Sequence, residues 1–285
     1  MACAPPRVIV VQERPWRRLW RLLKQTGIAT YQDNCFGIAK GVAYSGLLCL
    51  FPVLTSIAAI LFRANAEAVT RTLARFLYQI VPPGSEDLLR IQFVAKGLRP
   101  TWLVVVATLL SVWASSGAMM SLMEGFQAAY RLPTGRSFLK QRGVAVVLVF
   151  IGALPAVGCS FLIVFGARLL PGGRLTGWGA VLSVSLRYLV AIACVVLITG
   201  MVYYVGPNRP MKLKSAWPGA VAATGLWALL TSAFGWYVRN LANYNVMYGS
   251  IAAVIVLLVW MYLLAVIGLF GCEFNAERER LLTKT

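Results

Sequence analysis

Residues 216–277 read AWPGAVAATGLWALLTSAFGWYVRNLANYNVMYGSIAAVIVLLVWMYLLAVIGLFGCEFNAE, two long apolar runs joined by a short polar segment. The second run keeps about 24 residues, from Gly249 to Cys272, free of charge, which corresponds to roughly 36 Å of helix. Because a bilayer core is about 30 Å thick, such a helix crosses it with some tilt. This stretch therefore predicts an integral membrane protein.

The composition of the whole chain agrees with that prediction. Of its 285 residues, 59% are hydrophobic and only 13% are charged, whereas a soluble domain carries about a quarter charged residues. Apolar runs of about 20 residues recur without period-two alternation. We therefore predict an all-α polytopic membrane protein with six transmembrane helices and amphipathic interfacial helices, the spans being about 36–62, 102–124, 143–166, 182–205, 216–238 and 249–272.

Three regions follow from these spans. Residues 1–35 are predicted to be a cytoplasmic amphipathic segment, 36–277 a six-span membrane domain, and 278–285 a cytoplasmic tail. Two further amphipathic pieces are predicted in the loop 63–101. Residues 14–32 combine an apolar stripe at helical spacing with flanking basic side chains, which is typical of a helix on a membrane surface; the stripe is Trp16, Leu19, Trp20 and Leu23, and the basic residues are Arg17, Arg18, Arg21 and Lys24.

The charge balance is strongly basic, with 27 Lys and Arg against 9 Asp and Glu and a net charge of +18. In a membrane protein, Lys and Arg flank the spans and face anionic lipid headgroups. We therefore expect anionic membrane lipids, and not nucleic acid, as partners. Apart from the long first loop, the basic residues concentrate in the segments on the side of the two termini, which predicts that both termini are cytoplasmic.

Catalytic chemistry has little support in the sequence. The chain contains no His, and of its nine acids only two groups are close in sequence, Glu86-Asp87 and the Glu273/Glu277/Glu279 group next to Arg278 and Arg280. Metal-dependent phosphodiester cleavage needs clustered ligands, and metal-independent cleavage needs an acid–base pair. We expect no catalytic residue, no metal, no cofactor and no enzymatic activity.

Polar residues within the spans are better candidates, because polarity in the membrane must be compensated. Lys40, Glu124 and Glu273 are predicted at the same level, near the cytoplasmic interface, where they either form a charge cluster or reach separately to headgroups. Arg187 has two interpretations. If its span starts near Trp178, it is buried and needs an anionic partner; if the span starts at Leu186, it is an interfacial anchor.

Trp260 and Tyr262 lie near the predicted midplane, where an interfacial aromatic belt does not account for them. With Tyr44, Ser45 and a kink at Pro52 they could line a central cavity; the alternative is tight packing with satisfied hydrogen bonds. Small residues at close helix contacts are predicted at Gly37, Gly41, Gly219 and Gly249.

Three sequence pieces carry a resemblance to a known family: GVAYSGLLCLFPVL, GAMMSLMEGFQAAY, and the stretch from PNRPMKLKSAWPGA to CEFNAE. The chain resembles, from about residue 37 to 279, the YihY / virulence factor BrkB family of bacterial inner-membrane proteins, formerly labelled ribonuclease BN. The resemblance implies six helices in the inner membrane, cytoplasmic termini and a link with serum resistance. It implies no agreed reaction or substrate.

Three functions are therefore compared. The preferred hypothesis is transport or handling of a lipid or small solute of the cell envelope. The second is a scaffold that assembles with envelope proteins or with further copies of itself through small-residue faces, and it predicts a closed, dry bundle. The third is a ribonuclease, for which the only available residues are the acids at the end of the sixth span.

Overall fold

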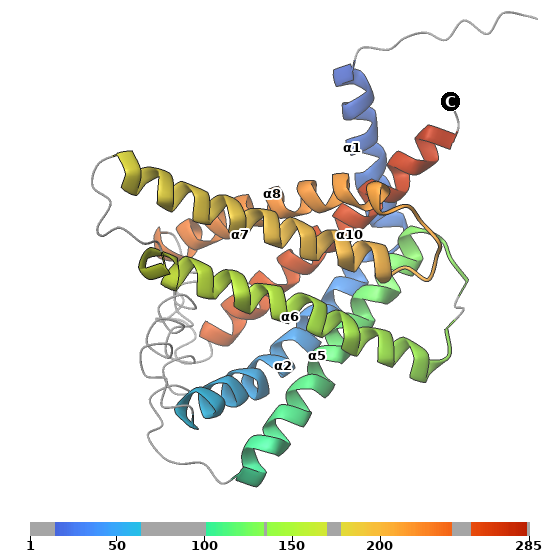
Figure 1. Ribbon diagram of the computed structural model, residues 1–285. Coiled ribbons are helices and arrows are strands. Elements are labelled where there is room, and N and C mark those ends of the chain that lie inside the picture. Colours follow the sequence, from blue (N-terminus) through green and yellow to red (C-terminus); the bar gives the residue numbers. More distant parts are fainter. Residues whose placement is uncertain (1–14, 64–100, 134–135, 170–177, 241–251, 284–285) are drawn as a thin grey trace, which may run out of the picture.

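The computed structural model describes residues 15–63, 101–133, 136–169, 178–240 and 252–283 (Figure 1). Their regular structure is entirely helical: α1 (Pro15–Gln32), α2 (Cys35–Arg63), α5 (Thr101–Ala129), α6 (Phe138–Leu169), α7 (Trp178–Val205), α8 (Leu213–Asn240) and α10 (Ala252–Thr283). The predicted amphipathic pieces of the loop 63–101, and Gly249, lie outside the described residues.

The helices coincide with the predicted spans. Within the described ranges, five of them, α2, α5, α7, α8 and α10, are long and apolar enough to cross a membrane. The 32-residue α6 covers the remaining predicted span. The chain is an all-α polytopic membrane protein, as the sequence predicted. The last helix continues past Cys272 to Thr283, so the residues beyond the predicted end of the sixth span are helical too.

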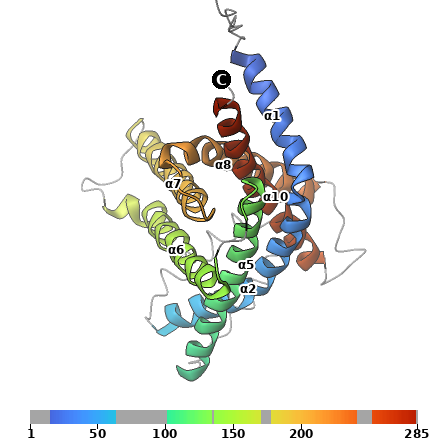
Figure 2. The same ribbon diagram turned by 90° about the vertical axis from the view of Figure 1, so that its right-hand side faces the viewer.

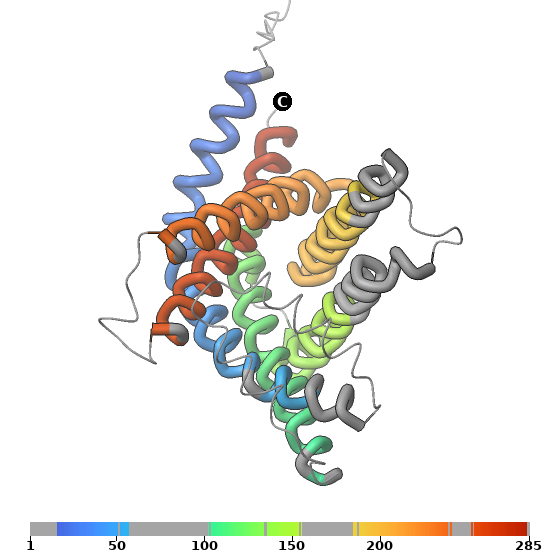
Figure 3. Tube along the Cα trace, turned by 90° about the vertical axis from the view of Figure 1, so that its left-hand side faces the viewer, coloured from blue at the N-terminus to red at the C-terminus, as the bar shows by residue number. Residues whose placement is uncertain are grey.

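The six long helices form a closed ring of neighbours. Following the chain, α2 packs on α5, α5 on α6, α6 on α7, α7 on α8 and α8 on α10, and α10 returns to α2. Figures 2 and 3 show α6 and α7 on one side of the bundle and α2, α5 and α10 on the other. Because α10 also contacts α5 and α1, it is the helix with the most neighbours.

The first helix lies on the end of the bundle where α10 ends, and we call this the terminal end (Figures 1 and 2). There α1 packs on α10 with Leu22 and Ala29 buried. The predicted apolar stripe points away from the bundle, since Trp16 and Trp20 are exposed. The chain then turns into α2 through Asn34, whose φ of 54° suits an asparagine. An exposed aromatic stripe beside basic residues suits a membrane surface.

The contact between α8 and α10 is unusually close. Pro218 lies inside α8 and removes one backbone donor. The Asn275 amide of α10 fits against this turn: its Oδ1 accepts from the Gly219 N–H at 2.7 Å, and its Nδ2 donates to the Ala216 carbonyl at 2.9 Å. A Cβ on Gly219 would lie 2.1 Å from the Gly271 carbonyl oxygen. The absence of a side chain at Gly219 therefore lets the backbones of α8 and α10 come this close.

Candidate functional site

A partly open cavity of about 550 Å³ lies inside the ring, between α2, α5, α7, α8 and α10. On α2 its lining follows one stripe of the helix, with Val42, Gly46, Cys49 and Val53 at spacings of four, three and four residues. The lining is largely apolar. Its polar groups include the hydroxyls of Ser115 and Thr199 among hydrocarbon side chains.

Phe126 and Tyr203 form the floor of the cavity on the side of the terminal end. Both are fully buried, and their rings meet edge to face with centroids 5.5 Å apart. The Tyr203 hydroxyl donates to the Gly268 carbonyl at 2.6 Å. Of the residues that line the cavity on α5, α7 and α10, these three lie nearest the terminal end. These residues therefore lie between the cavity and the charged residues at the terminal end.

One of the predicted cavity residues lines this space. Trp260 is only 9% exposed and borders the cavity, and its indole N–H has no partner among the described residues. Tyr262 is half-buried and packs against the core of the bundle instead. Tyr44 is 62% exposed, and neither it nor Ser45 borders the cavity, although Pro52 precedes the lining residue Val53.

The position of Arg187 is settled only for its backbone. Because α7 begins at Trp178, Arg187 lies about 14 Å along the helix by helical rise. The start of the helix does not decide between the two interpretations, because the stretch of α7 that is long and apolar enough to cross a membrane begins at Tyr188. Its side chain is outside the described part of the structure, so its burial stays a prediction.

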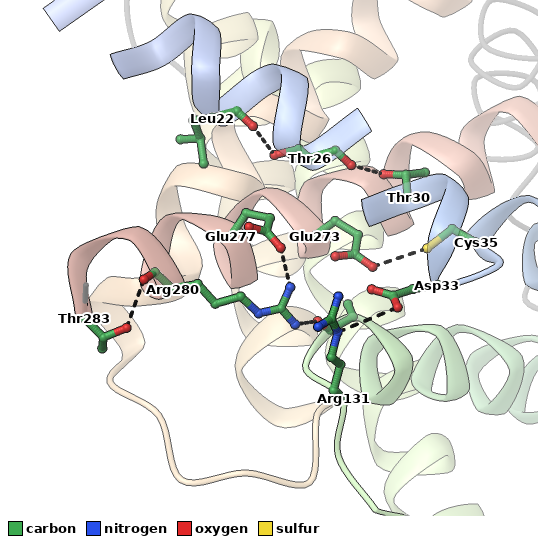
Figure 4. Close-up of polar contacts among 11 residues, drawn as sticks. Leu22, Thr26, Thr30, Asp33, Cys35, Arg131, Glu273, Glu277, Arg280 and Thr283 are labelled. Atoms are coloured by element: carbon green, nitrogen blue, oxygen red, sulfur yellow. Dashed lines mark hydrogen bonds and ion pairs between the residues drawn. The ribbon is translucent and has the colours of Figure 1, made fainter. Parts of the chain in front are cut away.

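Lys40, Glu124 and Glu273, predicted to lie at one level, have different surroundings. Lys40 and Glu124 are exposed, and within the described ranges no ion pair joins them. Glu273 is fully buried, and its Oε1 accepts from the Cys35 thiol at 3.6 Å (Figure 4). The carboxyl of Asp33, in the turn after α1, lies beside the Glu273 carboxyl and interacts with it electrostatically.

Arginines pair with the other acids at the terminal end. Arg280 pairs with Glu277 and also donates to the Ala129 carbonyl at 2.7 Å. Arg131 lies 3.9 Å from Asp33 (Figure 4). Arg209 reaches Glu279 at 2.5 Å. These contacts tie the ends of α5 and α10 and the loop before α8 into one charged layer.

Arg131 and Tyr130 complete this layer at the end of α5. Leu132 N–H bonds to the Gln127 carbonyl and Arg131 N–H to that of Ala128, the pattern of a Schellman cap. Arg131 occupies its left-handed position with a φ of 52°. The hydroxyl of Tyr130 is buried without a partner among the described residues, and burial raises the pKa of this tyrosine above its usual range.

Sequence reasoning missed a second basic site, on the outer face of α5 and α6. The Arg142 guanidinium lies 3.6 Å from the ring centre of Trp113 and donates to the Trp113 carbonyl at 2.9 Å. In the part of the chain that the structure describes, no carboxylate pairs with it. Its sequence signal was weak, because only the early start of α6 at Phe138 places this arginine inside a helix.

Metal chemistry has no ligand set in the described residues: no three His, Cys, Asp or Glu side chains are grouped there as metal ligands would be. The acids that the sequence offered for a nuclease instead face arginines or each other. Glu277 and Glu279 each pair with an arginine, and Glu273 faces Cys35 and Asp33.

Comparisons with known proteins agree with this architecture. A Bacillus subtilis protein, YfkH, whose name describes it as ribonuclease-like, is 30% identical over 243 residues, covering 82% of this chain and 86% of that protein. A UPF0761 membrane protein of Aeromonas salmonicida is 29% identical over 86% of this chain and 85% of its own. Another, of Aromatoleum aromaticum, is 26% identical over 93% of this chain and 66% of its own.

No solved structure matches the chain. The family model described as virulence factor BrkB matches residues 29–284, which include every long helix of the ring and the charged layer at the terminal end. The chain therefore belongs to the virulence factor BrkB family of membrane proteins.

Proposed function

We propose that this protein binds and moves a lipid, or a small solute with an apolar body, of the bacterial cell envelope. The observation that carries the proposal is the cavity inside the helix ring. Its volume of about 550 Å³ falls within the range of about 300–1,000 Å³ found for small-molecule sites. A scaffold protein has no need for such a space, because close packing of the bundle would stabilise it more.

The lining favours an acyl chain or a similar apolar group. Most of its side chains are hydrocarbon, and the hydroxyls of Ser115 and Thr199 offer few polar contacts. Apolar burial stabilises a ligand by roughly 25 cal/mol per Å² relative to water. A strongly polar solute would leave its hydrogen bonds unmade there, at a cost of about 1–3 kcal/mol each.

Arg142 supplies a site for an anionic headgroup. Its guanidinium stacks on the exposed Trp113, and an unpaired arginine at a membrane-facing helix surface favours a phosphate. Anionic lipids are accordingly the partners that we propose.

The orientation follows from the same charges. We place the protein in the inner membrane, with the terminal end and both termini in the cytoplasm, because the basic residues gather on that side. The exposed stripe of α1, with Trp16 and Trp20, would then rest on the anionic inner leaflet.

The test is lipid or solute movement in proteoliposomes made with the purified full-length chain. Ala118→Trp fills the cavity, because Ala118 borders it, and should lower the rate at least tenfold. Ala193→Trp makes the same chemical change at an exposed position of α7 and should leave the rate unchanged. Equal rates for the two variants, or no movement above protein-free liposomes, would refute the proposal.

The two other functions have less support. The scaffold hypothesis relied on the face of Gly37, Gly41 and Ser45, but its two glycines are used inside the chain: Gly41 faces Ser121 of α5, and Gly37 lies against Asn34. The ribonuclease hypothesis would draw support from the name of the Bacillus subtilis relative. RNA cleavage that persists at high purity and is lost with Glu277→Gln would restore it.

A further inference from the structure

Among the described residues of the terminal end, three acids pair with arginines and a fourth, Glu273, does not. Glu277 pairs with Arg280, Glu279 with Arg209, and Asp33 faces Arg131. Glu273 is fully buried, and within the described residues it forms no ion pair with an arginine or a lysine. Arg280 is near enough to act on it electrostatically, but its guanidinium is engaged by Glu277 and the Ala129 carbonyl.

Two carboxyl oxygens are left without partners at this point. Glu273 Oε2 and Asp33 Oδ2 are both buried and make no hydrogen bond within the described residues. Each unsatisfied buried oxygen destabilises the folded state, and a charged one does so more strongly. Two adjacent ionised carboxylates would also repel each other. One proton, held by one carboxyl and donated to the other, would give both oxygens a partner and remove the repulsion.

A third unpartnered group supports a site here. Tyr130 is 8% exposed, its buried hydroxyl has no partner among the described residues, and this tyrosine lies close enough to Glu273 to interact with it electrostatically. Buried polar groups in native proteins are almost always hydrogen-bonded. Three unpartnered groups in one place therefore indicate that a proton, and hydrogen bonds reorganised around it, belong to this layer.

We infer that Glu273 and Asp33 form a proton-binding carboxyl pair at the terminal end, with the proton shared between their two carboxyl groups. Asp33 is the member that exchanges it with water, since its side chain is 16% exposed and its partner Arg131 is 61% exposed. Glu273 is fully buried and lies about 7.5 Å along α10 from Gly268, which accepts the hydrogen bond of the cavity floor.

Several titratable and charged groups face the pair from the elements packed around it. They are Cys35 of α2, Tyr130 and Arg131 at the end of α5, and Cys272, Glu277 and Arg280 of α10. The thiol of Cys35 donates to the other oxygen of Glu273, so it stabilises the pair without supplying a charge. This proton site does not depend on the proposed transport, because it rests on the carboxyl geometry alone.

Infrared spectroscopy of the full-length protein in lipid nanodiscs tests the inference directly. A protonated carboxyl gives a C=O stretching band that an ionised one lacks. We expect this band at neutral pH, its loss in Glu273→Gln, and its retention in Glu124→Gln, a control at an exposed acid of α5. A band that is absent at neutral pH, or that survives Glu273→Gln, would overturn the inference.

Asp33→Asn provides an independent measurement if the buried substitution fails to fold. Removing the neighbouring charge should let Glu273 ionise more easily, so the midpoint at which the band disappears should fall by about one pH unit or more. An unchanged midpoint would show that Asp33 is no part of the site and would refute the pair. Thermal unfolding in the same nanodiscs confirms that each variant is folded.

Discussion

Replacing Gly219 by alanine should force α8 away from α10. The new Cβ would lie 2.1 Å from the Gly271 carbonyl oxygen, whereas ordinary contact begins at 3.4 Å, so the backbones would have to separate by about 1.3 Å at this point. The same Cβ would lie 2.5 Å from Asn275 Nδ2. The helix backbones cannot separate by this amount without losing contacts, and the Asn275 amide cannot move away without losing its two hydrogen bonds.

The magnitude follows from two contributions. Overpacking costs about 1–3 kcal/mol. The two hydrogen bonds of Asn275 contribute about 0.5–1.5 kcal/mol each, so the total is about 2–6 kcal/mol. For a chain of this size 1 kcal/mol corresponds to roughly 2–4 °C. The apparent unfolding temperature in detergent, followed by tryptophan fluorescence, should therefore fall by roughly 10 °C.

Gly225→Ala is the matched control in the same helix. Nothing lies within 4 Å of a Cβ built on Gly225, and alanine is favoured over glycine in a helix interior by about 0.5–1 kcal/mol. This variant should be as stable as the natural chain or slightly more so. If Gly219→Ala and Gly225→Ala unfold at the same temperature, the close contact of α8 with α10 does not stabilise the fold as we describe.

Three further predictions concern single side chains. Arg142→Gln should lower the binding of anionic lipid several-fold in a lipid-binding assay while leaving binding of zwitterionic lipid unchanged, because it removes the positive charge that stacks on Trp113; equal losses for both lipids would contradict it. Tyr203→Phe should lower the free energy of unfolding by about 1 kcal/mol, since it removes the hydrogen bond to Gly268. Arg131→Gly should raise it by about 1 kcal/mol in thermal unfolding, because glycine adopts a positive φ without strain. The pair with Asp33 contributes little, since its atoms are 3.9 Å apart and its arginine is exposed; destabilisation would show that the ion pair matters more than the backbone.

Hydropathy predicted the helices well, because crossing a bilayer fixes both the length and the composition of a span. Depth in the membrane was therefore predictable, but direction around each helix was not. Trp260 and Tyr262 were placed together near the midplane, yet residues two apart on a helix point about 200° apart. Only Trp260 borders the cavity, while Tyr262 packs into the core.

The same reasoning explains α2. Its cavity-lining residues follow the stripe of Val42, Gly46, Cys49 and Val53, and Tyr44 points away from it. Because these lining residues are as small and apolar as residues that pack between helices, the sequence of α2 does not distinguish a face toward a cavity from a face toward a neighbour. To predict which face of α2 lines the cavity, one must know which helices pack against each other, and hydropathy does not predict that order.

The charged layer was predicted in part. Glu273 was singled out as an acid at the end of the sixth span, but its partners Asp33 and Cys35 lie about 240 residues away in sequence. They reach it only because α1 and α2 pack on α10. Lys40 and Glu124 were expected at the same level as Glu273, but both lie on exposed faces. The depth of a charged residue along its span does not tell whether its side chain faces the interior of the bundle or its surface.

The last turns of α10 combine structural and chemical roles on opposite faces. Asn275 holds the Pro218 turn of α8, and Glu273, two residues earlier and thus about 200° around the helix, faces Cys35 and Asp33. Because Asn275 fixes the rotation of α10, Glu273 cannot turn away when its proton is lost. Ionisation of the pair would instead be accommodated on the side of α1 and α2, where Asp33 is partly exposed. The proton site would therefore act on the cavity through α2, which lines it, and not through α8.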